Sequence, residues 1–388
     1  QHMDKYECFE SQFVIILGIK LKTLENVDIS KVWEQLTVAY PYLSYKIEGN
    51  EFKPSAAMAP AIKIDTTEIK GDCQIQNINE AANSQFLKQS QSVQLFSSLY
   101  YYKRNDSLFI TLALNHALTD MVSATLLMSE ILRLIEGKPL ICYPQFSMQQ
   151  FNQLSVKEHF EETDFGAIAQ FDISKSNNQQ HKYSHKVFNI EQDQFQKLLQ
   201  KCKNVKRSFS SLVFALDLTS RLKSFPLSDG NIVIQIPVSR RSDVGIGDSI
   251  GDFVDAMFFQ LDSGAQTCTF DELWANIDQN LKQHRDFNDK IYQHSRSQRS
   301  GQKCQYQLNQ TMFSSCGGSQ AKITSNMNIE EAALMWSSNS DIYKNIFTLE
   351  SFQFNQKFSF CWIYSSDLEE DEIVKFVLQF KQILNEFL

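Results

Sequence analysis

The sequence contains little glycine and proline, with 13 Gly and 7 Pro among 388 residues. This scarcity excludes collagen-like and low-complexity chains, and a hydrophobic content of 43% argues against a disordered one. The eight cysteines are scattered along the chain, and no two of them form a CxxC pair. This scattered arrangement matches neither a zinc site nor a redox motif. We therefore expect reduced thiols and no metal.

An excess of positive charge is also missing. The 37 Lys and Arg residues are outnumbered by 45 Asp and Glu, for a formal net charge of −8. Because nucleic acid is bound by basic surfaces, we do not expect it as a partner. No run approaches the ~18 apolar residues of a membrane-spanning helix. The apolar stretch at 13–19 also lacks the flanks of a signal peptide. These observations predict a cytoplasmic protein without a transmembrane segment, and we expect a monomer.

Hydrophobic periodicity predicts alternating strands and helices in both halves of the chain. In the first half, strands are predicted at 13–21, 92–103 and 107–114, and helices after Asp28 and at 122–138. In the second half, helices are predicted at 195–202, 208–222, 269–281 and 373–387, and strands at 231–239 and 358–364. The most polar gap, 172–185, is interpreted as the crossover between the halves. The pattern predicts an α/β fold of two similar lobes, 1–171 and 186–388, each a mixed sheet flanked by helices.

One histidine stands out by its context. Among seven histidines, only His116 has an aspartate four residues later, Asp120, and the pair follows the buried strand 107–114. Loops at strand ends often display catalytic groups. The spacing alone decides little, since it arises by chance in about one such chain in three. A hydrogen-bonded core histidine is the alternative.

The segment LFITLALNHALTDMVSATLLMSEIL resembles the HHxxxDG region of the CoA-dependent acyltransferase superfamily. That group contains chloramphenicol acetyltransferase, alcohol O-acetyltransferases, BAHD acyltransferases and peptide-synthetase condensation domains. Four further segments are similar to family segments in the family's order: YPYLSYKI, IPVSRRSD, IGDFVDAMFFQLD and ITSNMN. The resemblance covers nearly the whole chain from residue 13. It implies two chloramphenicol-acetyltransferase-like lobes with an active-site channel between them.

The resemblance also implies an activity. The family transfers an acyl group directly from a CoA-type thioester to a hydroxyl or amine, without a covalent acyl-enzyme. Acyl-CoA, or an acyl-carrier thioester, would then be a co-substrate beside a small alcohol or amine, with no bound cofactor. Because a thioester is already activated, the site mainly has to deprotonate and hold the acceptor. A neutral imidazole, with an ordinary pKa of about 6.5, suits this role, so His116 is the predicted general base.

Asp120 is predicted to be structural, because a carboxylate directly on the imidazole would raise its pKa and favour the inactive protonated form. The resemblance implies that this aspartate pairs with an arginine, for which Arg241 stands in the family position and Arg240 is the fallback. For both arginines, a surface turn is the alternative. It also implies that Ser325 and Asn326 supply oxyanion or acceptor hydrogen bonds. Loop residues bonded to their own backbone are the alternative for these two.

Two departures from the family pattern support a competing hypothesis. Asn115 stands at the first histidine of HHxxxDG, and Met121 stands at its glycine, where a long side chain can obstruct close backbone approach. The competing hypothesis is an inactive relative that binds an acyl thioester, a carrier protein or another partner. A free-standing amide-forming condensation enzyme is a third.

Basic residues form two groups that are candidates for contacting the phosphates of a CoA-type donor. The first group is Lys203, Lys206 and Arg207, with Lys201 beside them. The second is Arg296, Arg299 and Lys303. A solvated surface is the alternative for both groups.

Overall fold

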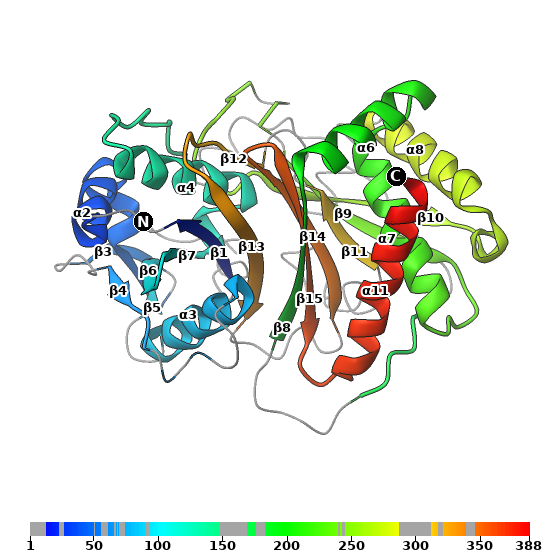
Figure 1. Cartoon of the computed structure of the whole chain (residues 1–388), viewed down its shortest axis with the longest axis horizontal. Helices are drawn as coiled ribbons and strands as arrows, with labels where there is room; N and C mark the ends of the chain where they lie inside the picture. Colours follow the sequence, from blue (N-terminus) through cyan, green and yellow to red (C-terminus); the bar gives the residue numbers. More distant parts are fainter. Residues whose placement is uncertain are drawn as a thin grey trace.

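The computed structural model shows two units side by side, one mainly blue to teal with the orange strand β13 (Ile329–Ser338) at its edge, and one mainly green to red (Figure 1). It describes residues 13–22, 27–49, 51–55, 61–65, 67, 69, 74–90, 94–146, 169–175, 183–239, 241–242, 245–286, 312–316, 321–338 and 346–388. No helix within these ranges is long and apolar enough to cross a membrane.

The first unit is built on a five-stranded sheet. Its strands, in spatial order, are β13 (Ile329–Ser338), β1 (Phe13–Lys22), β7 (Ser107–Asn115), β6 (Ser97–Arg104) and β4 (Ile62–Lys63). Helix α4 (Met121–Ile135), with α2 (Ile29–Ala39) beside it, lies on one side of the sheet, and α3 (Ile75–Ser90) lies on the other (Figure 1). Because both faces are covered, β7 is buried from Leu108 to Asn115, as its apolar sequence predicts.

The second unit has a larger sheet with helices on one face. Its strands are, in order, β10 (Val254–Leu261), β9 (Ile232–Ser239), β11 (Met312–Cys316), β14 (Phe347–Phe354), β15 (Lys357–Ser365) and β8 (Tyr183–Ile190), while β12 (Lys322–Ile323) pairs with β14. The helices are α6 (Gln192–Val205), α7 (Phe209–Ser224), α8 (Phe270–Asp286) and α11 (Glu370–Phe387) (Figure 1). A small third sheet joins β3 (Glu51–Pro54), β2 (Tyr45–Glu48) and β5 (Gln94–Leu95).

Strand β15 connects the two hydrophobic cores. Phe360 and Trp362 belong to the core beneath the helices of the second unit. Cys361 and Ile363 alternate with them and belong to the core of the first unit. Since successive side chains of a strand point to opposite faces, the second sheet is buried on both sides.

The mixed α/β architecture, with sheets flanked by helices, confirms the predicted fold class. The predicted helix starts are confirmed as well. Asp28 accepts hydrogen bonds from the N–H groups of Ser30 and Lys31 at the start of α2. At the start of α8, the N–H of Thr269 donates to the Glu272 carboxylate at 2.8 Å, as the predicted capping box requires.

Several long elements were not predicted, among them α3, β8, β13 and β14. Strand β13 comes from the second half of the chain, yet it pairs antiparallel with β1. The pairing starts with Phe13 opposite Ser338. Helix α3 is polar in sequence, and it buries Asn79 and Asn83 by hydrogen-bonding them. The lobe boundaries at 1–171 and 186–388 stay a prediction, and residues 176–182 of the expected crossover lie outside the described residues.

Gly18 allows α3 to approach the first sheet closely. The amide of Asn79 donates to the Ala333 carbonyl at 3.1 Å and accepts from the Thr111 hydroxyl at 3.0 Å. A Cβ atom on Gly18 would lie 1.9 Å from the Asn79 Oδ1 atom. The side chain of Asn79 is held at both ends, so it cannot retreat. Glycine is therefore required at this position of β1.

Replacing Gly18 with alanine should lower the free energy of unfolding by about 1–3 kcal/mol, the usual cost of overpacking a core. Urea unfolding followed by circular dichroism measures this change. Gly264→Ala is the matched control, because no atom lies within 4 Å of the Cβ that would be added there. Equal unfolding midpoints for the two variants would contradict the role given to Gly18.

Candidate active site

His116 lies in the connection between a buried strand and a buried helix. Strand β7 ends at Asn115, and residues His116–Leu118 form the short helix η3. The Asn115 side chain accepts from the N–H of Ala117 at 3.0 Å, and the Thr119 hydroxyl donates to the Asn115 carbonyl at 2.7 Å. The asparagine at the position of the family's first histidine is thus buried and closes the turn that presents His116.

Asp120 begins α4 and holds a buried arginine. Its carboxylate accepts from the N–H of Ser123 at 2.8 Å, which caps the helix. The Arg241 guanidinium donates to both carboxylate oxygens, at 2.6 and 2.8 Å. Both side chains are almost completely buried. The structure thus brings Asp120 and Arg241 into contact, whereas the fallback, Arg240, lies outside the described residues.

Arg241 uses its remaining donors to hold the segment that precedes β10. It donates to the carbonyls of Ser249, at 3.1 and 3.2 Å, and Gly251, at 3.2 Å. It also donates to the Ser123 hydroxyl at 2.8 Å, and its guanidinium lies 4.4 Å from the centre of the Phe253 ring. The buried cation is therefore surrounded by acceptors, as a buried charge requires.

The Asp120 carboxyl has a lowered pKa. Burial by itself raises the pKa, but the charge and hydrogen bonds of Arg241 act in the opposite direction, helped by the N–H groups of Ser123 and Phe253. The net result is a pKa below the ordinary value of an aspartate. Asp120 is therefore ionised at neutral pH and is not a proton carrier.

A second carboxylate, which was not predicted from the sequence, faces His116. The Oδ2 atom of Asp252 lies 3.8 Å from the Nδ1 atom of His116. The Asp252 side chain is fully buried, whereas the His116 side chain is 22% exposed. One feature of the sequence pointed to this residue, since Asp252 is a charged residue among the apolar neighbours of the IGDF segment. A carboxylate that is buried among apolar residues needs hydrogen-bond donors or a charged partner.

Met121, at the family's glycine position, fits the local backbone. It is the first residue of α4 and packs, partly buried, against the core of the first unit. The non-glycine residues with positive φ in the described part of the chain are Asn105, Cys142, Lys206 and Asn355. Met121 therefore needs no conformation that only glycine adopts readily.

Ser325 and Asn326 contact the other end of α4. The Ser325 hydroxyl donates to the Glu136 carboxylate at 2.5 Å, and the N–H of Asn326 donates to it at 3.0 Å. Glu136 follows the last residue of α4, and this 15-residue helix is about 22 Å long. The structure therefore does not bring these two predicted contacts to His116.

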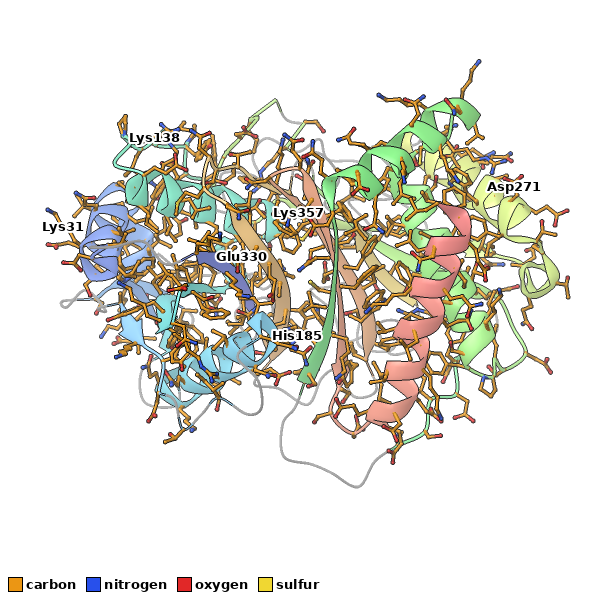
Figure 2. The ribbon with its side chains drawn as sticks, in the orientation of Figure 1. Lys31, Lys138, His185, Asp271, Glu330 and Lys357 are labelled. Carbon is orange, nitrogen blue, oxygen red and sulfur yellow. The ribbon has the colours of Figure 1, made fainter. Side chains whose placement is uncertain are left out.

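The first basic group lies at the end of α6, on the helical layer of the second unit (Figure 1). Arg207 pairs with the exposed Asp271 at 2.7 Å (labelled in Figure 2), and Lys206 adopts the left-handed conformation that ends α6. Lys203 is exposed in the last turn of α6. The role of this group in phosphate binding stays a prediction. The second group, Arg296, Arg299 and Lys303, lies outside the described residues.

Another histidine with a carboxylate partner lies near the boundary of the two units (His185 in Figure 2). Its Nδ1 atom is 3.3 Å from the Glu80 carboxylate, and its side chain is fully buried. A ring without solvent access cannot meet a substrate, so its arrangement differs from that of His116. In the ranges that the structure describes, no three His, Cys, Asp or Glu side chains gather as a metal site would require.

No protein-family model and no curated protein matches the sequence. Solved structures do match. Polyketide synthase associated protein 5 from Mycobacterium tuberculosis has a TM-score of 0.63 at 13% identity, covering 100% of this chain and 98% of that one. The condensation domain of the Monacolin K polyketide synthase MokA has a TM-score of 0.64 at 11% identity, covering 100% and 96%. The TRI3 trichothecene 15-O-acetyltransferase from Fusarium sporotrichioides has a TM-score of 0.64 at 8% identity, covering 99% and 95%.

The fold therefore belongs to the class shared by condensation domains and this acetyltransferase. The likeness extends over the full length of the chain in each case. The predicted two-lobed chloramphenicol-acetyltransferase-like fold is confirmed. At these identities the likeness shows the fold alone.

Removing the Asp120 carboxylate should destabilise the protein strongly. Asp120→Ala leaves the Arg241 cation buried without its anion, which typically costs about 3–5 kcal/mol of unfolding free energy. The matched control, Asp271→Ala, breaks an exposed aspartate–arginine pair and should cost about 0–1 kcal/mol. Urea unfolding of both variants measures the difference. Similar losses in the two would contradict a buried ion pair at Asp120.

The pH dependence of stability should carry the signature of Asp120. Because the pKa of Asp120 is lowered by folding, its contribution is fully present above the ordinary Asp pKa of about 3.9. It is lost as the pH falls through the lower folded pKa. The free-energy difference between wild type and Asp120→Asn should therefore shrink as the pH is reduced from 6 to 3. A difference that is constant or grows over this range would contradict the lowered pKa.

Proposed function

We propose that the protein is an acyltransferase that moves an acyl group from a CoA-type thioester to a hydroxyl or amine, with His116 as the general base. One observation carries the proposal. A partly exposed imidazole stands at the end of a buried strand, with its Nδ1 atom toward a buried carboxylate that comes from the other half of the chain. Groups that transfer protons in catalysis need this combination of access and fixed orientation.

The chemistry follows from the exposure of the ring. Because Nδ1 is buried, the exposed part of the side chain lies elsewhere on the ring, and Nε2 is the nitrogen assigned to the acceptor. In the proposed step, Nε2 takes the proton from the acceptor O–H or N–H while the acceptor atom attacks the thioester carbonyl. The C–S bond then breaks, and the imidazolium returns the proton to the departing thiolate.

Asp120 and Arg241 serve this step without touching the reactants. Their charges are buried and satisfied by one another and by backbone groups. They hold the start of α4 and the segment before β10, which are the two places from which His116 and Asp252 project. Damage from changing either charge is therefore structural in origin.

The proposed donor and acceptor are suggested by the names of structures that share the fold and not by the site itself. TRI3 is named as a 15-O-acetyltransferase, which favours an acetyl group and an oxygen acceptor. Two other solved structures of this fold are named as the condensation domain of a polyketide synthase and as a four-domain nonribosomal peptide synthetase, and they leave a carrier-bound thioester and an amine acceptor as the alternative. The assay therefore includes acyl-CoA and acyl-pantetheine donors, with panels of alcohols and amines. A protein that binds a donor without consuming it would be the inactive relative.

Replacing His116 with alanine should slow acyl transfer by about 10²–10⁴-fold, the range expected for loss of a general base. Thiol release from the donor in the presence of the acceptor measures the rate. Because the side chain lies in a turn and is partly exposed, the urea unfolding midpoint should stay close to that of wild type. That midpoint is the control for misfolding. Unchanged turnover in a folded His116→Ala variant would eliminate His116 as the base.

A further inference from the structure

We propose that Asp252 is a positioning residue for His116, which fixes the tautomer of the imidazole and stabilises its protonated form. This inference rests on the proposed function only for its effect on catalysis. The contact itself is between the Asp252 Oδ2 atom and the His116 Nδ1 atom, at 3.8 Å. The carboxylate has no exposed surface, so it acts through the imidazole and not on a reactant.

The orientation of the Asp252 carboxylate is set locally. Its Oδ1 atom accepts from the N–H of Val254 at 3.2 Å, which closes an Asx turn at the start of β10. This bond holds one oxygen at the backbone, and the other oxygen is the one that faces the imidazole. One oxygen of the Asp252 carboxylate therefore holds the Asx turn, and the other faces His116.

The residues on both sides of Asp252 are clamped to the first unit. Gly251 donates to the Ser123 hydroxyl at 3.0 Å and accepts from it at 2.7 Å, while Phe253 donates to the Asp120 carboxylate at 3.1 Å. A Cβ atom on Gly251 would lie 2.7 Å from the Phe146 carbonyl oxygen, so the backbone packs too closely for a side chain.

Ile250 extends this clamp. It donates to the Pro144 carbonyl at 2.8 Å and accepts from the N–H of Phe146 at 2.9 Å. Three residues that flank Asp252, namely Ile250, Gly251 and Phe253, are thus fixed by groups of the first half of the chain. The position of the carboxylate relative to His116 is therefore set by the packing of the two halves against each other.

A carboxylate in this place has two consequences for the ring. It favours a proton on Nδ1, which leaves the Nε2 lone pair free to accept a proton from the acceptor. It also stabilises the imidazolium and raises the pKa of His116. The base becomes stronger, but a larger fraction of it is protonated near neutral pH. The optimum for transfer should therefore lie on the alkaline side of the ordinary histidine pKa.

The other charged groups near the ring do not produce the same effect. Asp120 and Arg241 oppose each other at hydrogen-bonding distance, so their charges largely cancel at His116. The Tyr42 hydroxyl, which interacts electrostatically with Asp120, has a pKa well above its ordinary value because of burial and the influence of Tyr40 and Asp120, so it stays neutral. The part of β1 that pairs with Asn115, from Phe13 to Ile15, is apolar. Among the described residues, Asp252 is thus the carboxylate to which we assign the effect on His116.

The test is a nuclear magnetic resonance titration of the full chain labelled with ¹⁵N-histidine, with His116→Ala used to assign the His116 signal. In wild type, neutral His116 should carry its proton on Nδ1 and titrate above about 6.5, the ordinary histidine pKa. Asp252→Asn should lower the pKa of His116 by about 1–3 pH units, the size of effect expected from a neighbouring opposite charge. Asp248→Asn, which changes an exposed aspartate of the same segment, is the matched control and should leave that pKa unchanged.

The outcomes separate this inference from the proposed function. A neutral His116 with its proton on Nε2 in wild type, or the same His116 pKa in wild type and Asp252→Asn, would overturn the inference. The wild-type measurement needs no variant, so it decides the point even if Asp252→Asn does not fold. If acyl transfer occurs, its rate profile should move to lower pH in Asp252→Asn in parallel with the titration. If no transfer occurs, the proposed function fails and the titration still decides whether Asp252 pairs with His116.

Discussion

The buried ion pair between Asp120 and Arg241 is the interaction on which the site depends. Each member is nearly inaccessible to water, so neither charge is tolerable alone. Asp120 caps α4, and Arg241 donates hydrogen bonds to the carbonyls of Ser249 and Gly251. One pair of charges therefore fixes both segments that carry the candidate catalytic groups, and it links the two halves of the chain at the same point.

This arrangement separates two roles that carboxylates can have near a histidine. The Asp120 carboxylate accepts hydrogen bonds from a guanidinium and from backbone N–H groups, so it stabilises the fold and does not act on the imidazole. Asp252 has one oxygen bound to its own turn and the other toward His116. The first carboxylate is needed for the second to be in place. A protein of this fold can thus place a carboxylate beside the histidine without changing the residues of the HxxxD segment.

Much of this could be predicted from the sequence, because local patterns were strong. The apolar run of β7, the cap at Asp28 and the capping box at Thr269 all depend on neighbouring residues. Helix α3 and strand β13 could not be predicted in the same way. Helix α3 buries Asn79 against Thr111 and Ala333, and β13 pairs with a strand more than 300 positions away. Asp252 was missed for the same reason, since the charge inside the IGDF segment indicates a buried carboxylate but not its partner, His116, which is distant in sequence.

The central claim is that a single partly exposed imidazole takes the proton from the acceptor, so that the acyl group passes directly from the thioester to the acceptor with no acylated protein on the way. The most direct measurement is mass spectrometry of the full chain after incubation with an acyl thioester alone, combined with thiol release before and after an acceptor is added. The account predicts an unchanged protein mass and thiol release that begins only with the acceptor. An acylated protein, or thiol release at the full rate without any acceptor, would contradict it.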